Sequence, residues 1–239
     1  MSAMPDAPLD LYMARSPVAF KVLIALEEMN LSYNPIPVDV TTGEQLTAHY
    51  SALNPNQRIP ALADHAPADG GAPLSVFESG AILAYLAEKS GRFFPVSLRE
   101  RMSVLQWVFW QMAGQGPAMG QARHFLYFAR ERCPYAIERF TYEAGRLCRV
   151  LDRQLADREY ICGEYSIADM ACWPWLLFAR SNQQDLQAFP DLARWFGAVE
   201  RRDAVIRVAE RYWKGHAIES ALPLAPAAQQ ILFGWKSLS

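Results

Sequence analysis

The chain has 239 residues, of which 51% are hydrophobic and 20% charged, and its formal net charge is -2. At about 150 residues per domain, this length allows one large domain or two small ones and excludes an array of modules. The balanced charge gives no electrostatic reason to expect a nucleic acid or an anionic membrane as a partner. The apolar fraction is high enough for a packed core without disulfide bonds.

The N-terminal ten residues contain two acids and two prolines, with neither a basic region nor an apolar run, so a secretory signal is not expected. The most apolar stretch, Met170–Ala179, is interrupted by Pro174 and is about half of the ~18 residues that suggest a membrane span. We therefore expect a cytoplasmic protein with reduced thiols and no membrane partner.

The cysteines and histidines show no spacing typical of a metal or redox site. The four cysteines all lie in the second half of the chain, and no two are spaced as CxxC. A zinc knuckle and a dithiol redox motif are thereby excluded, and we expect no bound metal. The cysteines are Cys133, Cys148, Cys162 and Cys172.

The first predicted elements are a strand and a helix. Alternating apolar residues predict a strand over Leu9–Met13, and apolar residues at helical spacing from Val18 predict a helix that ends at Asn30. Ser16 is a natural N-cap for this helix. Pro17 suits the first helical position because the N–H that proline lacks would be unpaired there anyway.

Three more strands are predicted before the pattern changes. Asn34–Val40 alternates in polarity, but Pro35 and Pro37 cannot donate to a ladder, which favours an edge strand. Arg58–Asp64 and Pro73–Phe77 flank a stretch rich in turn formers and are predicted to pair antiparallel. The order is then βαβ, a connecting segment, and ββα, the last helix being capped by Ser79.

Helical patterns replace the strands after Pro95. The change of period places a domain boundary near Gly91–Leu98. The fold class is therefore an α/β domain over residues 1–92 followed by an all-helical domain over residues 98–239. Helices are predicted at Leu98–Gln121, Tyr135–Leu155, Ile167–Ser181 and Pro190–Trp213.

Two features of the second domain concern folding. Ser166 and Asp169 have the spacing of a capping box at a helix start, flanked by Tyr165 and Met170 as a hydrophobic staple. The tail His216–Ser239 is either disordered or packed back over a groove, and both alternatives stay open.

Three motifs, in this order, resemble the cytosolic glutathione transferases. They are Asn54–Leu62 (NPNQRIPAL), Phe77–Ile82 (FESGAI) and Tyr165–Asp169 (YSIAD). Within that family Gln106–Gln111 and Pro134–Arg139 look like the Nu class, and the resemblance spans roughly Leu9–Trp213. It implies a thioredoxin-like first domain, a homodimer, and glutathione-dependent reduction of disulfide bonds in a small substrate, with glutathione as the thiol source.

The resemblance assigns Ser16 to the activation of glutathione. A free thiol has a pKa near ~8.5, and helix N-terminal N–H groups help to stabilise a thiolate. Ser16 is expected to donate to the sulfur, with the N–H of Val18 beside it, although the residues alone indicate only a cap. The class has Asn where this chain has Val18, which removes a side-chain donor. Tyr12, whose counterpart is the activator in other classes, is assigned to packing.

The resemblance also implies residues that bind the rest of glutathione. The Ile59–Pro60 bond is expected to be cis, so that the backbone of Ile59 pairs with the cysteinyl part. Ser79 would hold the γ-glutamyl carboxylate, and Glu78 would accept from the ammonium group. The alternatives are an ordinary trans bond and simple caps at a helix start.

Two further contacts are implied. Gln45 matches a glutathione-contacting glutamine, the alternative being a solvated loop residue. Arg139 matches an arginine that reaches the active site from the helical domain and binds a carboxylate; the alternative is a solvated helix residue. Other functions also stay open, namely a conjugating or peroxidase-type glutathione transferase and a catalytically silent binding or regulatory relative.

Overall fold

The computed structural model describes residues 8–212 and 224–234. The described residues form two compact units, one of residues 8–90 with 224–234 and the other of residues 91–212. Residues 224–234, which are predicted to belong to the helical domain, pack with the first unit instead. No helix in the described ranges combines the length and the apolar character needed to cross a membrane.

The first unit is built on a four-stranded mixed sheet with the strand order β2-β1-β3-β4. Its strands are β1 (Leu9–Met13), β2 (Tyr33–Pro37), β3 (Ala61–Asp64) and β4 (Leu74–Phe77). β1 pairs parallel with β2 and antiparallel with β3, and β3 pairs antiparallel with β4. The two prolines of β2 lie at an edge of the sheet, as predicted, because they cannot donate to a second neighbour.

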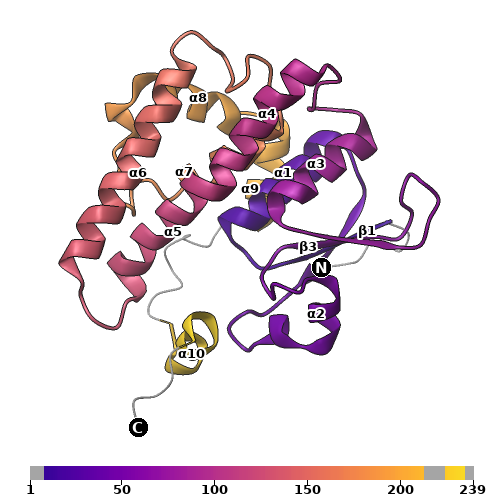
Figure 1. Ribbon diagram of the computed structural model, residues 1–239, viewed down its shortest axis with the longest axis horizontal. Coiled ribbons are helices and arrows are strands. Elements are labelled where there is room, and N and C mark those ends of the chain that lie inside the picture. Colours follow the sequence, from indigo (N-terminus) through magenta and orange to yellow (C-terminus); the bar gives the residue numbers. More distant parts are fainter. Residues whose placement is uncertain (1–7, 213–223, 235–239) are drawn as a thin grey trace. The chain divides into compact units, whose positions relative to one another are not determined.

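Helices cover both faces of this sheet (Figure 1). α1 (Pro17–Met29) and α3 (Ser79–Ser90) pack against each other on one face, and α2 (Ala48–Leu53) lies on the other. Alternate residues of a strand point to opposite faces. Leu9 and Leu11 are fully buried, while Tyr12 packs against the cluster that contains Tyr50 of α2. This is the predicted α/β arrangement.

The helix ends of the first unit differ in one detail from the prediction. Ser16 is the N-cap of α1, and Asn30 ends the helix in the left-handed conformation with φ 54°. α3 begins at Ser79 itself, so the expectation that Ser79 precedes the helix as its cap is wrong by one position. The reason is that Glu78, with φ 67°, turns the chain directly from β4 into the helix.

The second unit is all-helical, as predicted. Its longer α-helices are α4 (Leu98–Trp110), α5 (Gly116–Arg123), α6 (Pro134–Leu155), α7 (Ile167–Leu176), α8 (Pro190–Glu200) and α9 (Asp203–Tyr212). The first predicted helix runs to Phe128 because π-helical segments at Gln111–Gln115 and His124–Phe128 continue it. The expectation of one helix over Pro190–Trp213 is wrong. The helix is interrupted at residues 201–202, and Asp203 begins a new one. Trp213 lies outside the described residues.

The capping box of α7 is confirmed. The Asp169 carboxylate accepts hydrogen bonds from the N–H of Ser166 at 3.0 Å and of Ile161 at 3.0 Å, and from Trp195 Nε1 at 2.8 Å. Burial raises its pKa to about 6, even though these hydrogen bonds act in the opposite direction. Asp169 therefore joins the loop before α7 to α8 inside the unit.

The described part of the tail forms α10 (Pro226–Phe233). It lies beside the segment that follows β2. The Ile231 side chain of α10 is next to Gly43, and two of its carbon atoms would be 3.9 Å from a Cβ added to this glycine. The described part of the tail is therefore ordered, and the alternative that the tail covers a groove stays a prediction. His216 and Trp235 lie outside the described residues.

Candidate functional site

The strand register brings several candidate residues to one end of the sheet. Tyr12 lies opposite Ala61, and Ala61 lies opposite Phe77. The end of β1, the start of β3 and the end of β4 are therefore neighbours. The segments that adjoin these points carry Ser16, Val18, Ile59, Pro60, Glu78 and Ser79.

Ser16 acts as a helix cap in this structure. Its Oγ accepts a hydrogen bond from the N–H of Ala19 at 3.3 Å and donates to the carbonyl of Ala14 at 3.1 Å. A hydroxyl has one hydrogen to donate. Donation to a sulfur therefore requires this hydrogen to leave the Ala14 carbonyl, a rotation of the O–H bond that can leave the cap bond from Ala19 in place.

The start of α1 has one backbone donor without a partner among the described residues. Pro17 has no N–H, and the N–H groups of Ala19 and Phe20 bond to Ser16 Oγ and to the Ser16 carbonyl. Within residues 8–212 and 224–234, the Val18 N–H makes no hydrogen bond. First-turn N–H groups of a helix have no partner inside it and favour an anion nearby. Val18 thus offers its backbone where the resemblance predicted a donor.

Tyr12 is a packing residue in this structure. Burial, and secondarily the charge of Asp10, raise the pKa of its hydroxyl. Its ring lies edge-on to Tyr50 with centroids 6.2 Å apart, and its centroid is 6.0 Å from that of His49. A protonated, packed phenol fits the packing role predicted for it.

Glu78 and Ser79 form the second helix start at this end of the sheet. Glu78 is exposed and holds the left-handed φ of 67°. This conformation costs a residue with a side chain roughly 1–2 kcal/mol and persists only where the surroundings enforce it. Ser79 is only 3% exposed, and its Oγ accepts a hydrogen bond from Lys21 Nζ at 3.3 Å.

The remaining candidates in the first unit are also ordered. The Ile59–Pro60 bond is cis, so the trans alternative is wrong. Gln45 is 1% exposed, and its Nε2 donates to the carbonyl of Val40 at 3.3 Å. The solvated alternative for Gln45 is therefore wrong as well. Its Oε1 is buried and has no hydrogen-bond partner among the described residues.

Arg139 belongs to the other unit. It is exposed on α6 of the helical unit, whereas the other predicted site residues belong to the first unit.

Lys21 is a residue that the sequence analysis missed. Its side chain is 1% exposed, and it reaches the start of α3 from the middle of α1. One signal was available in the sequence, since Lys21 is the single charged residue within the apolar run Val18–Leu26. A lysine is almost never fully buried without a polar partner.

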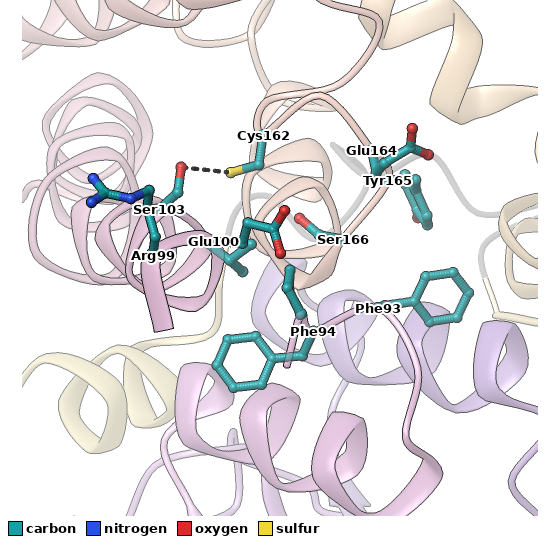
Figure 2. Close-up of a pocket in the computed structure, with 11 residues that line it drawn as sticks. Phe93, Phe94, Arg99, Glu100, Ser103, Cys162, Glu164, Tyr165 and Ser166 are labelled. Carbon is teal, nitrogen blue, oxygen red and sulfur yellow. Dashed lines mark hydrogen bonds between the residues drawn. The ribbon is translucent and has the colours of Figure 1, made fainter. Parts of the chain in front are cut away.

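All four cysteines lie in the helical unit, and the structure holds two of them as thiols. Figure 2 shows Cys162 at a cavity of about 610 Å³, with Ser103 donating to its sulfur at 3.9 Å. Burial raises the pKa of Cys162 to about 11 and that of Cys148 to about 12. Neither is a thiolate at neutral pH, the form that attacks disulfides. Across the described ranges, no cluster of three His, Cys, Asp or Glu side chains is placed to hold a metal.

Comparison with known proteins decides the family. Residues 7–88 match the model of the glutathione S-transferase N-terminal domain, and residues 134–198 match that of the C-terminal domain. The chain belongs to the glutathione S-transferase family. This glutathione transferase is 47% identical over 197 residues to the disulfide-bond oxidoreductase YfcG of Escherichia coli K12, an alignment that covers 82% of this chain and 92% of YfcG.

Two solved structures of bacterial glutathione transferases are also similar. The enzyme of Burkholderia graminis, with two glutathione molecules per subunit, is 40% identical with a TM-score of 0.83, and the match covers 89% of this chain and 92% of that one. The enzyme of Pseudomonas putida, with one glutathione disulfide per subunit, is 39% identical with a TM-score of 0.80, covering 86% and 92%.

Proposed function

We propose that this glutathione transferase reduces disulfide bonds in small substrates, with glutathione as the source of both electrons and thiols. The observation that carries the proposal is the set of two helix starts, at Ser16–Val18 and Glu78–Ser79, beside one end of the sheet. The names of the relatives and the ligands in their structures support it. The protonated thiols of Cys148 and Cys162 support a sulfur that comes from outside the protein.

The reaction takes place in two exchange steps. A glutathione thiolate attacks one sulfur of the substrate disulfide, so a glutathione–substrate disulfide forms and the other substrate sulfur leaves as a thiolate. A second glutathione thiolate then attacks the glutathione sulfur of that mixed disulfide. The products are glutathione disulfide and the second substrate thiolate, so two glutathiones are oxidised for each disulfide reduced. The ligands bound to the two similar structures, a pair of glutathiones and glutathione disulfide, match the reductant and product of this scheme.

The start of α1 stabilises the attacking thiolate. The Val18 N–H is unpaired in the described structure, and the Ser16 hydroxyl supplies a second donor when it turns from the Ala14 carbonyl. Hydrogen bonds to an ionised acceptor are about twice as strong as neutral ones. They lower the pKa of the bound thiol because they favour its charged form.

The other residues hold the peptide part of glutathione. Ile59 presents its backbone to the cysteinyl residue, as an added strand would. Ser79 and the start of α3 bind the γ-glutamyl carboxylate, and Glu78 binds the ammonium group. Gln45 contacts the peptide through its buried amide, and Arg139 binds a carboxylate, as the family resemblance implies.

We further propose that the protein is a homodimer. Several large apolar side chains are exposed on the separate units, among them Leu74 and Phe77 at the β4 edge and Phe109 on α4, which is 67% exposed. Exposed apolar side chains that gather in one patch are typical of interfaces, and the family resemblance implies a homodimer. Light scattering of the purified protein is expected to give twice the chain mass, and a monomer at micromolar concentration would refute this proposal.

One observation favours a second candidate, a silent relative that binds glutathione without turnover. The Ser16 hydrogen is donated to the Ala14 carbonyl, and Val18 supplies no side-chain donor. In that case glutathione would bind, yet no thiolate would form at neutral pH.

A coupled assay distinguishes these functions. Turnover of a small dialkyl disulfide is measured with glutathione and a recycling reductase, beside rates on an aryl halide and an organic peroxide. We expect the disulfide to give the highest rate, and we expect Glu78→Gln to weaken glutathione binding measured by calorimetry. Binding without turnover would identify the silent relative, and a faster rate on the halide or the peroxide would identify a conjugating or peroxidase-type enzyme.

A further inference from the structure

A buried lysine lies next to the proposed γ-glutamyl site. Lys21 is on α1, the helix that packs against α3, and its ammonium group reaches the first residue of α3. The side chains of Lys21 and Ser79 are 1% and 3% exposed. Removing an ammonium group from water is costly, so a lysine in this position requires polar compensation.

The geometry fixes what the Ser79 hydroxyl can do. Lys21 Nζ donates to Ser79 Oγ at 3.3 Å, and an ammonium group can only donate. One lone pair of the hydroxyl is therefore occupied by the lysine, and its single hydrogen cannot be donated to Lys21. Rotation of the O–H bond can present this hydrogen to an acceptor on a ligand. A carboxylate at the start of α3 is such an acceptor, and the first-turn N–H groups of the helix favour the same anion.

We infer that Lys21 is a positioning residue of the glutathione site, which sets the Ser79 hydroxyl as a donor to the γ-glutamyl carboxylate and brings a buried positive charge close to that anion. The inference rests on the proposed function, because it concerns how the proposed ligand is recognised. The ligand feature that Lys21 selects is the α-carboxylate of the γ-glutamyl residue. The thiol and the glycyl end are recognised elsewhere.

Two ligands and two variants test this inference. The ligands are glutathione and 4-aminobutanoyl-cysteinylglycine, which is glutathione without the γ-glutamyl α-carboxylate. The variants are Lys21→Met and the matched control Lys89→Met. Lys89 is a second lysine of the first unit, on the last turn of α3, and its ammonium pairs with Asp64 at 2.7 Å.

The expected results are specific to one ligand. Lys21→Met weakens glutathione binding about tenfold or more, the effect of losing one charge-assisted contact, and changes affinity for the analogue less than about twofold. In the disulfide assay the KM for glutathione rises by a similar factor, while kcat at saturating glutathione stays within about threefold of wild type. Lys89→Met leaves the preference for glutathione over the analogue unchanged.

The outcomes separate this inference from the proposed function. If wild type binds glutathione and Lys21→Met retains its preference over the analogue, Lys21 has only a structural role and the inference is wrong. Equal losses for both ligands would overturn it too. If wild type binds neither ligand, the proposed function itself fails. Should Lys21→Met not fold, Lys21→Gln keeps a donor for Ser79 without the charge, and a fall in preference of about threefold is expected.

Discussion

The two units of the molecule use polar groups in opposite ways. In the first unit, the half-buried Val18 N–H has no partner among the described residues and the Glu78 side chain is exposed, so a donor and a carboxylate are available to a ligand. In the helical unit, Asp169 is fully buried and all of its described partners are internal, while Cys148 is held as a buried thiol. Polar groups left open at helix starts indicate binding and chemistry, whereas polar groups satisfied inside a core indicate folding.

The largest expected effect is on the stability of the helical unit, where polar groups serve folding. Asp169→Asn turns an acceptor into a donor facing the N–H of Ser166, and we expect it to lower the free energy of unfolding by about 3 kcal/mol. Urea denaturation measures the loss. Calorimetry on the folded fraction is expected to give wild-type affinity for glutathione. A variant that keeps its stability but loses affinity would reverse the roles assigned to the two units.

The next largest effect is on turnover, and it concerns Ser16 in the first unit. Ser16→Ala removes a donor to the thiolate, and we expect kcat for disulfide reduction to fall by about 10- to 100-fold, with a smaller loss of glutathione affinity. The variant also loses a helix cap, which costs about 1 kcal/mol of stability. Steady-state kinetics and thermal unfolding measure the two effects separately.

Ser97→Ala is the matched control for Ser16→Ala. Ser97 caps α4 by accepting from the N–H of Glu100 at 3.4 Å, so its loss removes a cap of the same kind in the helical unit. We expect a comparable fall in stability with unchanged turnover. If Ser16→Ala behaves like Ser97→Ala, Ser16 is only a cap and the thiolate is activated by another group.

A smaller effect is the pH dependence of the stability of the first unit. Burial acts to raise the pKa of Asp64, but hydrogen bonds from Lys89 and Tyr85 outweigh it and lower the pKa. A carboxyl with a lowered folded-state pKa stabilises the fold above its unfolded value of about 3.9, and this contribution is lost as the pH falls through the folded pKa. We expect Lys89→Met to cost about 1–2 kcal/mol at pH 7 and less below about pH 4, measured by urea denaturation across pH. A cost independent of pH would show that Lys89 contributes only packing.

Much of the fold was predictable because it follows local patterns. The alternation in Leu9–Met13 and the prolines of β2 located these strands, and the spacing of Ser166 and Asp169 located the start of α7. The continuation of the first long helix to Phe128 was not predictable, because π-helical turns shift the helical period. The break before Asp203 was missed because apolar spacing continues across it.

The candidate site was only partly predictable. The resemblance located Ser16, Glu78 and Ser79, but their meeting at one end of the sheet depends on strand register. Lys21 was missed because its role depends on contact with a residue 58 positions away. The burial of Gln45 likewise could not be read from its polar neighbours in the loop.

The central claim is that glutathione, and no cysteine of this chain, supplies the reacting sulfur. The most direct test is the glutathione-coupled reduction of a small dialkyl disulfide by wild type and by a variant that carries Cys133→Ser, Cys148→Ala, Cys162→Ser and Cys172→Ala. Should that variant not fold, two double variants replace it: Cys133→Ser with Cys162→Ser, which keeps the two buried cysteines, and Cys148→Ala with Cys172→Ala. We predict turnover above background for wild type, and kcat within about threefold of it for every folded variant. No turnover by wild type, or its loss with the cysteines, would contradict the account.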